Sequence, residues 1–468
     1  MVFNNPPFKT RADISGLKVT IMGLGLNGGG LASALFFAKE GAVVTVTDKK
    51  SAQELAPSIA ALSQFPLIRF VLGSHEMSDF TDADLVIKNP GVKLAGNEFL
   101  SASRSIETDI SVFLRFTRSP IIAVTGSKGK SSTVSALNYA MKAFGYPVFL
   151  GGNITVSPLT FLDETRPDTP VILELSSWQL ADLRGRSLLK PPVAVLTPIM
   201  SDHQNWYGGM EPYVADKKLI YADQDNKCHL ICNYDDEWGK VFASETRAQV
   251  HWYSTKPLPP DLNGAWLNGD GSGVMRNGTD SPVEILPAMI TVPGNHMRQN
   301  LLNAAQAMVL FGADPASTKD ALAHFPGIEH RLELFHEENG LRYYNDSAAT
   351  IPEAVAAALD SFEGNVILLT GGTDKNLDFT PLAEVAHLAK KIILLAGTGT
   401  DKLIPMLQAR NIPFVGPCLN IIELVQAVRA NAVSGDNVVF SPGATSFGMF
   451  INEFDRGNKF RDAVKNQL

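Results

Sequence analysis

The sequence predicts an α/β protein with three domains, of which the first and last are Rossmann-like and the central one carries a P-loop. Three observations support this fold class. With 468 residues the chain is long for a single hydrophobic core. Two glycine-rich turns each follow an apolar run and precede a helical stretch. The last third repeats apolar runs separated by helical stretches, as parallel crossover connections require. We therefore expect domains over 1–118, 119–326 and 327–468.

Composition and charge narrow the class of protein. The chain is 45% hydrophobic and has a formal net charge of −8, with no basic tail or stripe, which argues against nucleic acid as a partner. The N-terminal residues lack the apolar core of a signal peptide, and no window approaches the ~20 apolar residues of a membrane span. Cys228, Cys232 and Cys418 show no pairing pattern, and Cys228 and Cys232 have no neighbours at zinc-ligand spacing. We expect a soluble, cytoplasmic protein in which Cys228 and Cys232 are small buried hydrophobes.

The N-terminal part reads as a strand, a glycine turn, a helix and a second strand. Leu17–Gly23 is an apolar run that leads into GLGLNG, a G-x-G-x-x-G turn. A helix is expected over Leu31–Glu40, and the next strand ends at Asp48. A carboxylate about 20 residues beyond such glycines is typical of dinucleotide sites, in which the helix N-terminus faces phosphate. Any nucleotide diphosphate could bind there. A further strand over Leu85–Lys88 leads to the turn at 89–91.

The segment Ile121–Thr133, IIAVTGSKGKSST, predicts a phosphate-binding turn between a strand and a helix. Gly126 and Gly129 allow backbone amides to face one anion, Lys130 adds a point charge, and Ser131 or Ser132 can ligate Mg²⁺. Val124 stands where the full P-loop has glycine, so only the shortened form G-x-x-G-K-S is present. The alternative is a capped strand-to-helix turn, but turn chemistry does not explain a lysine between glycine and two serines.

Polar residues follow the neighbouring apolar runs. A strand over Pro147–Leu150 runs into Asn153, whose amide can face a ligand. Val171–Leu175 carries Glu174 at the end where open α/β sheets bind ligands, a position suited to holding Mg²⁺. Val193–Thr197 leads to Asp202 and His203. The alternatives are a partly exposed acid at 174 and a purely structural histidine at 203.

The rest of the chain alternates helices and strands. Tyr213–Tyr221 reads as a helix, and from the residues alone its adjacent lysines Lys217 and Lys218 are best explained as solvated surface groups. Gly264–Ser281 reads as a β-hairpin and Ala304–Val309 as part of a helix. Strands of the last third are expected over Leu341–Asn345, Asn365–Thr370, Lys391–Ala396 and Asn437–Ser441. Polar and glycine residues at their ends predict a substrate site.

Taken in order, these motifs resemble those of the Mur ligases over nearly the whole chain, and most closely those of the members that add D-glutamate. The resemblance rests on the segments GLGLNG, TGSKGKSS, GGNI, ELSSWQL, the Asp-His pair at 202 and 203, YVADKKLIY, GNHMRQN, GIEHRLE, NDSAAT, GGTDKNLDF, SPGATSFGMF and EFDRGNKF. It implies a monomeric ligase of peptidoglycan precursor synthesis with ATP and Mg²⁺ as cofactors. UDP-N-acetylmuramoyl-L-alanine would react with ATP to an acyl phosphate, which D-glutamate would then attack.

The resemblance also implies site residues. Lys130, Glu174, His203 and Lys217 would be catalytic, and Ser131, Glu174, His203 and Lys217 would hold metal. ATP would be bound by Gly126, Ser127, Lys128, Gly129, Lys130, Ser131, Ser132, Asn300, His330, Arg331 and Asp346. The UDP-sugar would be bound by Gly25, Leu26, Asn27, Gly28, Asp48, Asn89, Asn153 and Ser176. D-glutamate would be bound by Thr350, Lys375, Ser446 and Phe454.

Lys217 matches, by its position after Tyr213, the lysine that the family carbamylates. An ordinary lysine, with a pKa of about 10.4, would repel Mg²⁺, whereas a carbamate is an anionic oxygen ligand. The chain also departs from the family pattern. Lys128 replaces a usual asparagine, Met297 stands where an asparagine usually follows the histidine, Ala348 stands where a lysine is expected, and Thr155 replaces a glycine.

Three alternatives stand beside this interpretation. The first is a sister ligase for another amino acid, including one that adds glutamate to a folate, although the dinucleotide-like N-terminal domain counts against a folate substrate. The second is a nucleotide-binding regulatory homologue without turnover, against which the joint presence of Lys130, Glu174, His203 and Lys217 argues. The third is a dinucleotide oxidoreductase, in which a second phosphate loop would have no role.

Overall fold

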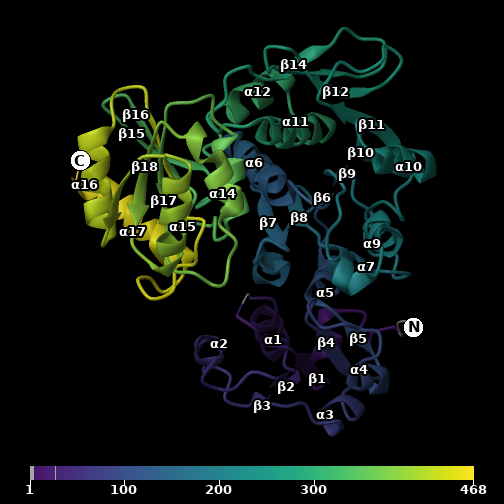
Figure 1. The fold of residues 1–468 in the computed structure, drawn as a ribbon. Coiled ribbons are helices and arrows are strands. Elements are labelled where there is room, and N and C mark those ends of the chain that lie inside the picture. The colour runs from purple at the N-terminus through teal and green to yellow at the C-terminus, as the bar shows by residue number, and fades with distance from the viewer. Residues whose placement is uncertain (1–4, 27, 468) are drawn as a thin grey trace. The chain divides into compact units, whose positions relative to one another are not determined.

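The computed structural model describes residues 5–26 and 28–467 and contains three sheets (Figure 1). The chain divides into two compact units. The first unit contains the residues up to Leu286 together with Asn300–Ala321, and the second contains Pro287–Gln299 and the residues from Leu322 onward. The N-terminal and central sheets belong to the first unit and the C-terminal sheet belongs to the second. Each unit is described by itself below.

The N-terminal sheet is five-stranded and parallel, in the order β3-β2-β1-β4-β5. The strands are β1 (Lys18–Met22), β2 (Val43–Asp48), β3 (Arg69–Leu72), β4 (Leu85–Lys88) and β5 (Ile106–Glu107). The helices are the 3₁₀ turn η1 (Arg11–Ile14), α1 (Gly29–Lys39), α2 (Ala56–Ala61), α3 (Ser78–Thr81), α4 (Glu98–Ala102) and α5 (Asp109–Phe116). Alternate residues of β1 pack against α1 and α5 on one face and against α3 and α4 on the other. The strand order reverses between β1 and β4, which is where such sheets bind ligands.

The central sheet has nine strands in the order β14-β13-β12-β11-β10-β9-β6-β8-β7. The strands are β6 (Ile121–Thr125), β7 (Phe149–Gly152), β8 (Val171–Glu174), β9 (Val193–Leu196), β10 (His229–Asn233), β11 (Gln249–Ser254), β12 (Gly264–Leu267), β13 (Gly273–Arg276) and β14 (Val283–Leu286). Only β12, β13 and β14 pair antiparallel. Its helices are α6 (Lys130–Ala143), η2 (Pro158–Glu164), α7 (Ser177–Ala181), α8 (Gln204–Tyr207), α9 (Met210–Lys217), η3 (Lys218–Ile220), α10 (Glu237–Glu245), α11 (Asn295–Leu310) and α12 (Pro315–Ala323).

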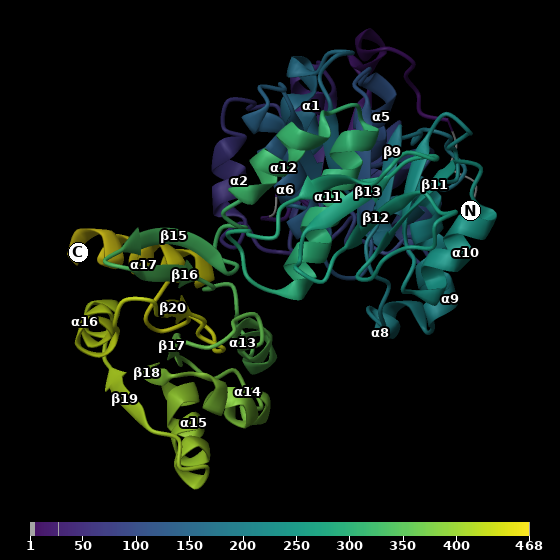
Figure 2. The ribbon, with the colours of Figure 1, turned by 90° about the horizontal axis from the view of Figure 1, so that it is seen from above.

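The C-terminal sheet has six strands in the order β15-β16-β20-β17-β18-β19, and only β15 runs antiparallel to its neighbour. The strands are β15 (Glu333–Glu338), β16 (Leu341–Asn345), β17 (Val366–Thr370), β18 (Lys391–Leu395), β19 (Phe414–Cys418) and β20 (Asn437–Phe440). The helices are α13 (Pro352–Leu359), α14 (Thr380–Val385), η4 (Ala386–Leu388), α15 (Thr398–Ala409), α16 (Ile421–Asn431) and α17 (Glu453–Gln467). As Figure 2 shows, α13, α14 and α15 cover one face of this sheet, and α16 and α17 cover the other.

Most predicted elements are confirmed to within two or three residues, and the hairpin expected in Gly264–Ser281 is confirmed by the antiparallel pair β12 and β13. The helix predicted over Tyr213–Tyr221 was wrong in its last turn, because α9 ends at Lys217 and a 3₁₀ turn follows. Cys228 and Cys232 are buried and unpaired, as expected, and Cys418 is buried and unpaired as well. The domain boundaries placed after Arg118 and Pro326 stay predictions.

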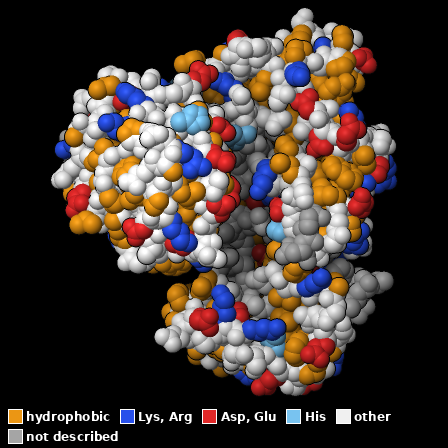
Figure 3. All heavy atoms as spheres, viewed as in Figure 1, with side chains coloured by type: hydrophobic (Ala, Val, Ile, Leu, Met, Phe, Trp, Pro, Cys, Tyr) orange, Lys and Arg blue, Asp and Glu red, His pale blue; other side chains and the backbone are white. Residues whose placement is uncertain are grey.

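Two surface properties bear on function. In the described part of the chain, no helix is long and apolar enough to cross a membrane. The face drawn in Figure 3 carries basic and acidic side chains interspersed, without a large region of one sign.

Candidate functional site

The phosphate-binding turn has the backbone that its glycines predict. Gly126 and Gly129 have φ angles of 148° and 87°. A Cβ at 126 would lie 1.9 Å from the Thr197 hydroxyl oxygen, and a Cβ at 129 would lie 2.3 Å from the Asn300 side-chain oxygen. A side chain at either position would therefore collide with its neighbour as well as strain the backbone. The turn ends at the N-terminus of α6, where unpaired amides attract an anion.

The cation of this turn is Lys130. Its Nζ donates to the carbonyl oxygens of Gly126 at 2.9 Å and Ser127 at 3.2 Å, so the side chain folds back over the turn. Burial lowers the pKa of Lys130, and the nearby Glu174 carboxylate opposes that shift. Lys128 is exposed on the same turn and its charge also disfavours a second cation at Lys130.

The serines of the turn have different positions. The Ser127 hydroxyl donates to the Met200 carbonyl oxygen at 2.9 Å, accepts from the Met200 amide, and lies 3.0 Å from the Tyr213 hydroxyl. Its side chain therefore holds the loop after β9 in place. Ser131 and Ser132 are half-buried in the first turn of α6. Their hydroxyls lie at the helix end that an anion and its counter-ion would approach.

Glu174 ends β8, which pairs with β6 so that Glu174 lies opposite Val124. This residue is 1% exposed. Its Oε1 accepts a hydrogen bond from the Asn153 side-chain amide at 2.8 Å, while Oε2 is sealed from solvent and has no partner. A buried carboxylate oxygen without a donor is costly. Because Glu174 lies beside the phosphate turn, its unpaired Oε2 is suited to bind a cation there.

Lys217 is buried against the same turn, contrary to the expectation of a solvated surface lysine. Its Nζ donates to the Gly126 carbonyl oxygen at 2.7 Å and lies 4.6 Å from the centre of the Tyr213 ring. Burial, together with the charge of Lys130, lowers the pKa of Lys217 to about 7. The neighbouring Lys218 instead pairs with Glu245 at the surface. The structure thus separates the two adjacent lysines, which the residues alone do not distinguish and of which the resemblance singles out Lys217.

His203 lies on the loop after β9 with a φ angle of 50°. Its Nε2 is 3.8 Å from a carboxylate oxygen of Asp202, and its ring packs 4.9 Å from the ring of Trp178. Trp178, in the ELSSWQL motif, also packs 4.8 Å from Trp206. Among the residues that the structure describes, no three His, Cys, Asp or Glu side chains gather as metal ligands. Glu174 and the hydroxyl groups of the turn are therefore the oxygen atoms that this part of the site offers to a cation.

The glycine turn after β1 is shaped by Asp48. The Gly25 amide donates to Asp48 Oδ2 at 3.1 Å, and the Lys50 amide donates to Oδ1 at 2.9 Å. Asp48 therefore positions the turn with both oxygens. Gly28 caps α1 with a φ angle of 87°, and Leu26 is exposed. Asn27 lies outside the described residues.

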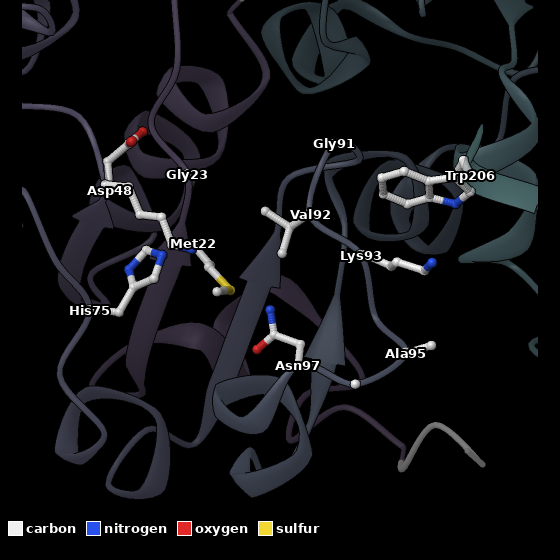
Figure 4. A pocket seen from close by; sticks show the side chains of 12 residues that line it. Met22, Gly23, Asp48, His75, Gly91, Val92, Lys93, Ala95, Asn97 and Trp206 are labelled. Carbon is white, nitrogen blue, oxygen red and sulfur yellow. The ribbon is translucent and has the colours of Figure 1, made fainter. Parts of the chain in front are cut away.

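A cavity of about 470 Å³ lies at the carboxyl ends of β1, β2 and β4 (Figure 4). It contains residues that the sequence reasoning missed, namely His75, Lys93, Asn97 and Trp206. Lys93 Nζ lies 5.0 Å from the centre of the Trp206 ring, so the central sheet's loop contributes one wall. The neighbouring Asn89 side chain accepts from the Gly91 amide at 3.1 Å and shapes the 89–91 turn.

The other two predicted sugar-nucleotide residues lie nearer to the phosphate turn. The Asn153 amide nitrogen donates to the Glu174 carbonyl oxygen at 2.8 Å, in addition to the side-chain bond described above. Ser176 is the N-cap of α7 and forms a capping box with Gln179. These contacts show Asn153 and Ser176 stabilising the loop after β8.

A buried ion pair joins the N-terminal and central sheets of the first unit. Lys88 Nζ lies 2.8 Å from an Asp182 carboxylate oxygen, and the two side chains are 2% and 6% exposed. The same ammonium donates to the carbonyl oxygens of Asn89 and Val92 at 3.2 and 3.0 Å. Burial raises the pKa of Asp182 to about 6 against the opposing effect of Lys88. This pair fixes the loop that lines the cavity, and no local sequence signal predicted it.

Asn300 belongs to the first unit and borders Gly129, whereas His330, Arg331 and Asp346 belong to the second. Asp346 is buried; it accepts from the Ser441 hydroxyl at 2.6 Å and from the Leu332 amide at 3.1 Å. Burial raises the pKa of Asp346 to about 7. His330 lies 2.9 Å from the Asn345 side-chain nitrogen, and Arg331 is exposed.

The residues predicted for D-glutamate lie on loops of the second unit. Lys375 is exposed and its Nζ lies 5.5 Å from the centre of the Phe447 ring, next to the buried Ser446. Phe454 is half-exposed, with its ring 5.6 Å from that of His330, and Thr350 is half-buried after the 345–349 loop. Thr373 pairs with Thr445, so the loop that carries Lys375 lies beside the loop that carries Ser446.

Arg456, which the sequence reasoning missed, holds two of these loops together. It is fully buried and donates to the Ala444 carbonyl oxygen at 2.8 Å and to the Ser347 carbonyl oxygen at 2.8 Å. Burial lowers its pKa to about 10. The EFDRGNKF motif contains this residue, but other charged residues surround it there, so nothing in the sequence signals that Arg456 is buried.

The structure also shows the surroundings of three positions that depart from the family pattern. Ala348 is half-buried and its amide donates to the His330 carbonyl oxygen at 2.9 Å. Met297 is buried in α11. Thr155 has a φ angle of 62°, which is strained for a β-branched residue.

Comparison with protein-family profiles finds three consecutive matches. They are the Mur ligase MurD-like N-terminal domain over residues 17–111, the Mur ligase middle domain over 124–308 and the Mur ligase glutamate ligase domain over 330–443. Curated relatives named UDP-N-acetylmuramoylalanine--D-glutamate ligase include one from Treponema pallidum, 45% identical over 98% of this chain and 99% of its own. Another, from Borreliella burgdorferi strain ZS7, is 39% identical over 97% of this chain and 99% of its own.

Solved structures share the fold at low sequence identity. A UDP-N-acetylmuramate-alanine ligase from Thermotoga maritima has a TM-score of 0.60 at 18% identity and covers 97% of this chain and 100% of its own. A MurF ligase from Thermotoga maritima in complex with ADP has a TM-score of 0.54 at 15% identity and covers 98% of each chain.

Proposed function

Since the chain belongs to the Mur ligase family, we propose that it is an ATP-dependent ligase that joins D-glutamate to UDP-N-acetylmuramoyl-L-alanine in peptidoglycan precursor synthesis. Its relatives supply the reaction. The observation that carries the proposal is the burial of Lys217 on the phosphate turn, beside an unpaired Glu174 oxygen. Nucleotide binding alone does not require a buried lysine with a pKa of about 7 on the phosphate turn, whereas catalysis does require groups with such shifted pKa values.

The reaction has two steps. The terminal carboxylate of the sugar peptide attacks the γ-phosphorus of ATP, so that one O–P bond forms, another breaks, and ADP leaves. The amine of D-glutamate then attacks the acyl carbon, inorganic phosphate leaves, and the amine gives up a proton. Transfer between two anions needs concentrated positive charge and in-line placement. Lys130 and the amides at the start of α6 supply the charge on the protein side.

The residues present fit Mg²⁺. Glu174 Oε2 is an unpaired oxygen, and the Ser131 hydroxyl lies at the start of α6. We propose that these two groups and an anionic Lys217 hold Mg²⁺, with His203 in a second metal site. Bound Mg²⁺ would offset the charge of the phosphates.

The proposed modification of Lys217 is a carbamate. A neutral amine adds to CO₂, so that an N–C bond forms and a proton is released. With a pKa of about 7, a large fraction of Lys217 is neutral at physiological pH, whereas an ordinary lysine is almost entirely protonated. The product is an oxygen ligand in place of a cation that would repel Mg²⁺.

We propose the remaining roles from the resemblance, with the structural features that are compatible with them. The diphosphate would lie on the turn Gly25–Gly28 and the uridine in the adjacent cavity, which Asp48 and Asn89 border or shape. Asn153 and Ser176 would face the sugar peptide, and Asn300, His330, Arg331 and Asp346 would contact ATP. The exposed Lys375 ammonium and the Ser446 hydroxyl suit the two carboxylates of D-glutamate, with Thr350 and Phe454 beside them. We place this monomeric enzyme in the cytoplasm and divide its roles at the predicted boundaries 118 and 326.

The test uses the purified full-length protein with ATP, Mg²⁺ and UDP-N-acetylmuramoyl-L-alanine, screened across D- and L-amino acids. Phosphate release and the mass of the product are measured together. We expect ADP, phosphate and a product that carries one glutamate, with D-glutamate strongly preferred. Release with a different amino acid would assign another specificity, and no release with any of them would refute the proposal.

A further inference from the structure

His75 lies at one end of the cavity described above, three residues beyond β3. In a sheet of this order the diphosphate lies at the N-terminus of α1 and the ribose lies near the end of β2. The cavity reaches from Asp48 at the end of β2 to His75 beyond β3, so it offers space for the base on that side. Figure 4 shows the His75 ring among the cavity side chains, next to Met22 and below Asp48 in that view. A base attached to a ribose at Asp48 would therefore meet His75.

The His75 ring is held in one orientation. Its Nδ1 lies 2.7 Å from the hydroxyl oxygen of the buried Thr47, and its faces and edges contact the rings of Phe80 and Phe99 at centre distances of 5.8 and 5.4 Å. No described residue hydrogen-bonds to Nε2. The contact with Thr47 thus occupies one nitrogen and leaves the other for a ligand.

The Thr47 hydroxyl also decides which nitrogen carries the proton. It donates to the Ser74 carbonyl oxygen at 3.3 Å, and a carbonyl oxygen can only accept. Because a hydroxyl has one proton, Thr47 satisfies both contacts only if it donates to Ser74 and accepts from His75 Nδ1–H. The neutral ring then has an unprotonated Nε2, which is a hydrogen-bond acceptor.

The surroundings keep the ring neutral. Burial and the nearby Lys49 lower the pKa of His75, and Asp48 opposes them more weakly. Lys93 is a further cation that lines the cavity. At neutral pH the ring therefore presents an acceptor rather than a second N–H.

We propose that His75 is a specificity-determining residue that reads the base of the sugar nucleotide by accepting the N3–H of uracil at its Nε2. The inference rests on the proposed function. Uracil has a donor at N3, whereas cytosine has a lone pair there, so the same nitrogen that binds uracil repels cytosine. When two buried hydrogen-bond acceptors face each other, as Nε2 and cytosine N3 would, the affinity typically falls about tenfold to a hundredfold. The chain would accordingly discriminate uridine from cytidine nucleotides through Thr47, His75 and the base.

The test measures the dissociation constants of UDP and CDP for the full-length protein by calorimetry. We expect the wild type to bind UDP at least about tenfold more tightly than CDP. His75→Leu removes the acceptor and should bring the two affinities to within about threefold, mainly by weakening UDP. Thr47→Val keeps the ring but removes the group that fixes its proton, and should also reduce the ratio. Thr45→Val, the same change two residues earlier on β2, is the matched control and should leave the ratio unchanged.

A second measurement does not depend on the variants binding nucleotide. In ¹⁵N-histidine spectra of the wild type, His75 should show the Nδ1–H tautomer, and Thr47→Val should change its populations. An unchanged UDP-to-CDP ratio in both His75→Leu and Thr47→Val, with ligase turnover intact in the wild type, would overturn the inference and leave the proposed function standing. A wild type that neither binds UDP nor turns over the sugar nucleotide would overturn both.

Discussion

The Nζ atom of Lys217 lies 2.7 Å from the carbonyl oxygen of Gly126, so a buried lysine from α9 touches the backbone of the phosphate-binding turn. A cation in this place would compete with Mg²⁺ for the same phosphates, whereas a carbamate would help to bind it. The contact therefore places Lys217 beside the phosphates, where carbamylation would turn a positive charge into a negative one.

Replacing Lys217 with alanine is expected to abolish turnover, with a fall in kcat of about a hundredfold or more, because an anionic metal ligand is lost. Added acetate or formate should restore part of the activity by supplying a carboxylate to the space. Lys218→Ala is the matched control, since Lys218 pairs with Glu245 at the surface, and it should retain nearly full activity. Full activity in Lys217→Ala would contradict the assignment.

Glu174→Gln is expected to lower kcat by about a hundredfold. The glutamine keeps the shape of the side chain and its contact with Asn153, but it removes the charge that would attract Mg²⁺. Activity should recover in part at higher Mg²⁺ concentration, and the melting temperature should not fall, because an uncompensated buried carboxylate has been neutralised. Glu237→Gln on the exposed face of α10 serves as the control. An unchanged Mg²⁺ dependence would show that Glu174 is not a ligand.

Lys88→Met is expected to destabilise the first unit by about 3–5 kcal/mol, because Asp182 would be left as a buried charge without its partner. The double variant Lys88→Met with Asp182→Leu should return to near the wild-type stability, since it removes both charges. Lys190→Met breaks an exposed pair with Asp225 and should cost no more than about 1 kcal/mol. Urea unfolding measures all of them, and equal losses at positions 88 and 190 would argue against a buried pair.

Asp346 predicts a pH dependence of stability. Its pKa is raised to about 7 in the folded state, whereas an unfolded aspartate titrates near 3.9. The folded chain therefore holds a proton that the unfolded chain has lost, so this contribution is full below the unfolded pKa and is lost as pH rises through 7. Asp346→Asn does not titrate. Relative to wild type it should gain about 1 kcal/mol of stability between pH 6 and pH 8.

Melting temperatures at the two pH values test this expectation. Asp378→Asn, at an exposed position of the same unit, should show no such pH-dependent gain. A difference between Asp346→Asn and wild type that stays constant with pH would mean that Asp346 is ionised throughout.

Thr155→Gly is expected to stabilise the first unit by about 1 kcal/mol, because the φ angle of 62° strains a β-branched residue more than glycine costs in chain entropy. Asn339→Gly is the matched control at a φ angle of 53°, since asparagine tolerates this region well and should gain little. Thermal melting of both variants measures the difference. A loss of stability in Thr155→Gly would indicate that the threonine side chain makes up for its strain.

Local patterns predicted the elements that carry phosphate chemistry. The run Ile121–Thr125 is buried on both faces, so its β-branched residues identified β6 without ambiguity. The strands β3 and β19 are mostly half-buried or exposed, and their patterns gave no such signal. Glu174 was predicted as a ligand because it ends a buried strand, and a strand's end is visible in the sequence.

The sequence by itself determined the apolar strands that precede the functional turns, the two glycine turns and the carboxylate at the end of β8, because each depends on periodicity and turn chemistry within a few residues. Only the tertiary structure decided that Lys217 is buried while Lys218 is half-buried and pairs with Glu245, that Lys88 pairs with Asp182, and that His75 and Trp206 line one cavity. Those relationships join residues that lie far apart in the chain. Burial and pairing depend on the residues that pack against a side chain, and those residues are not adjacent to it in the sequence.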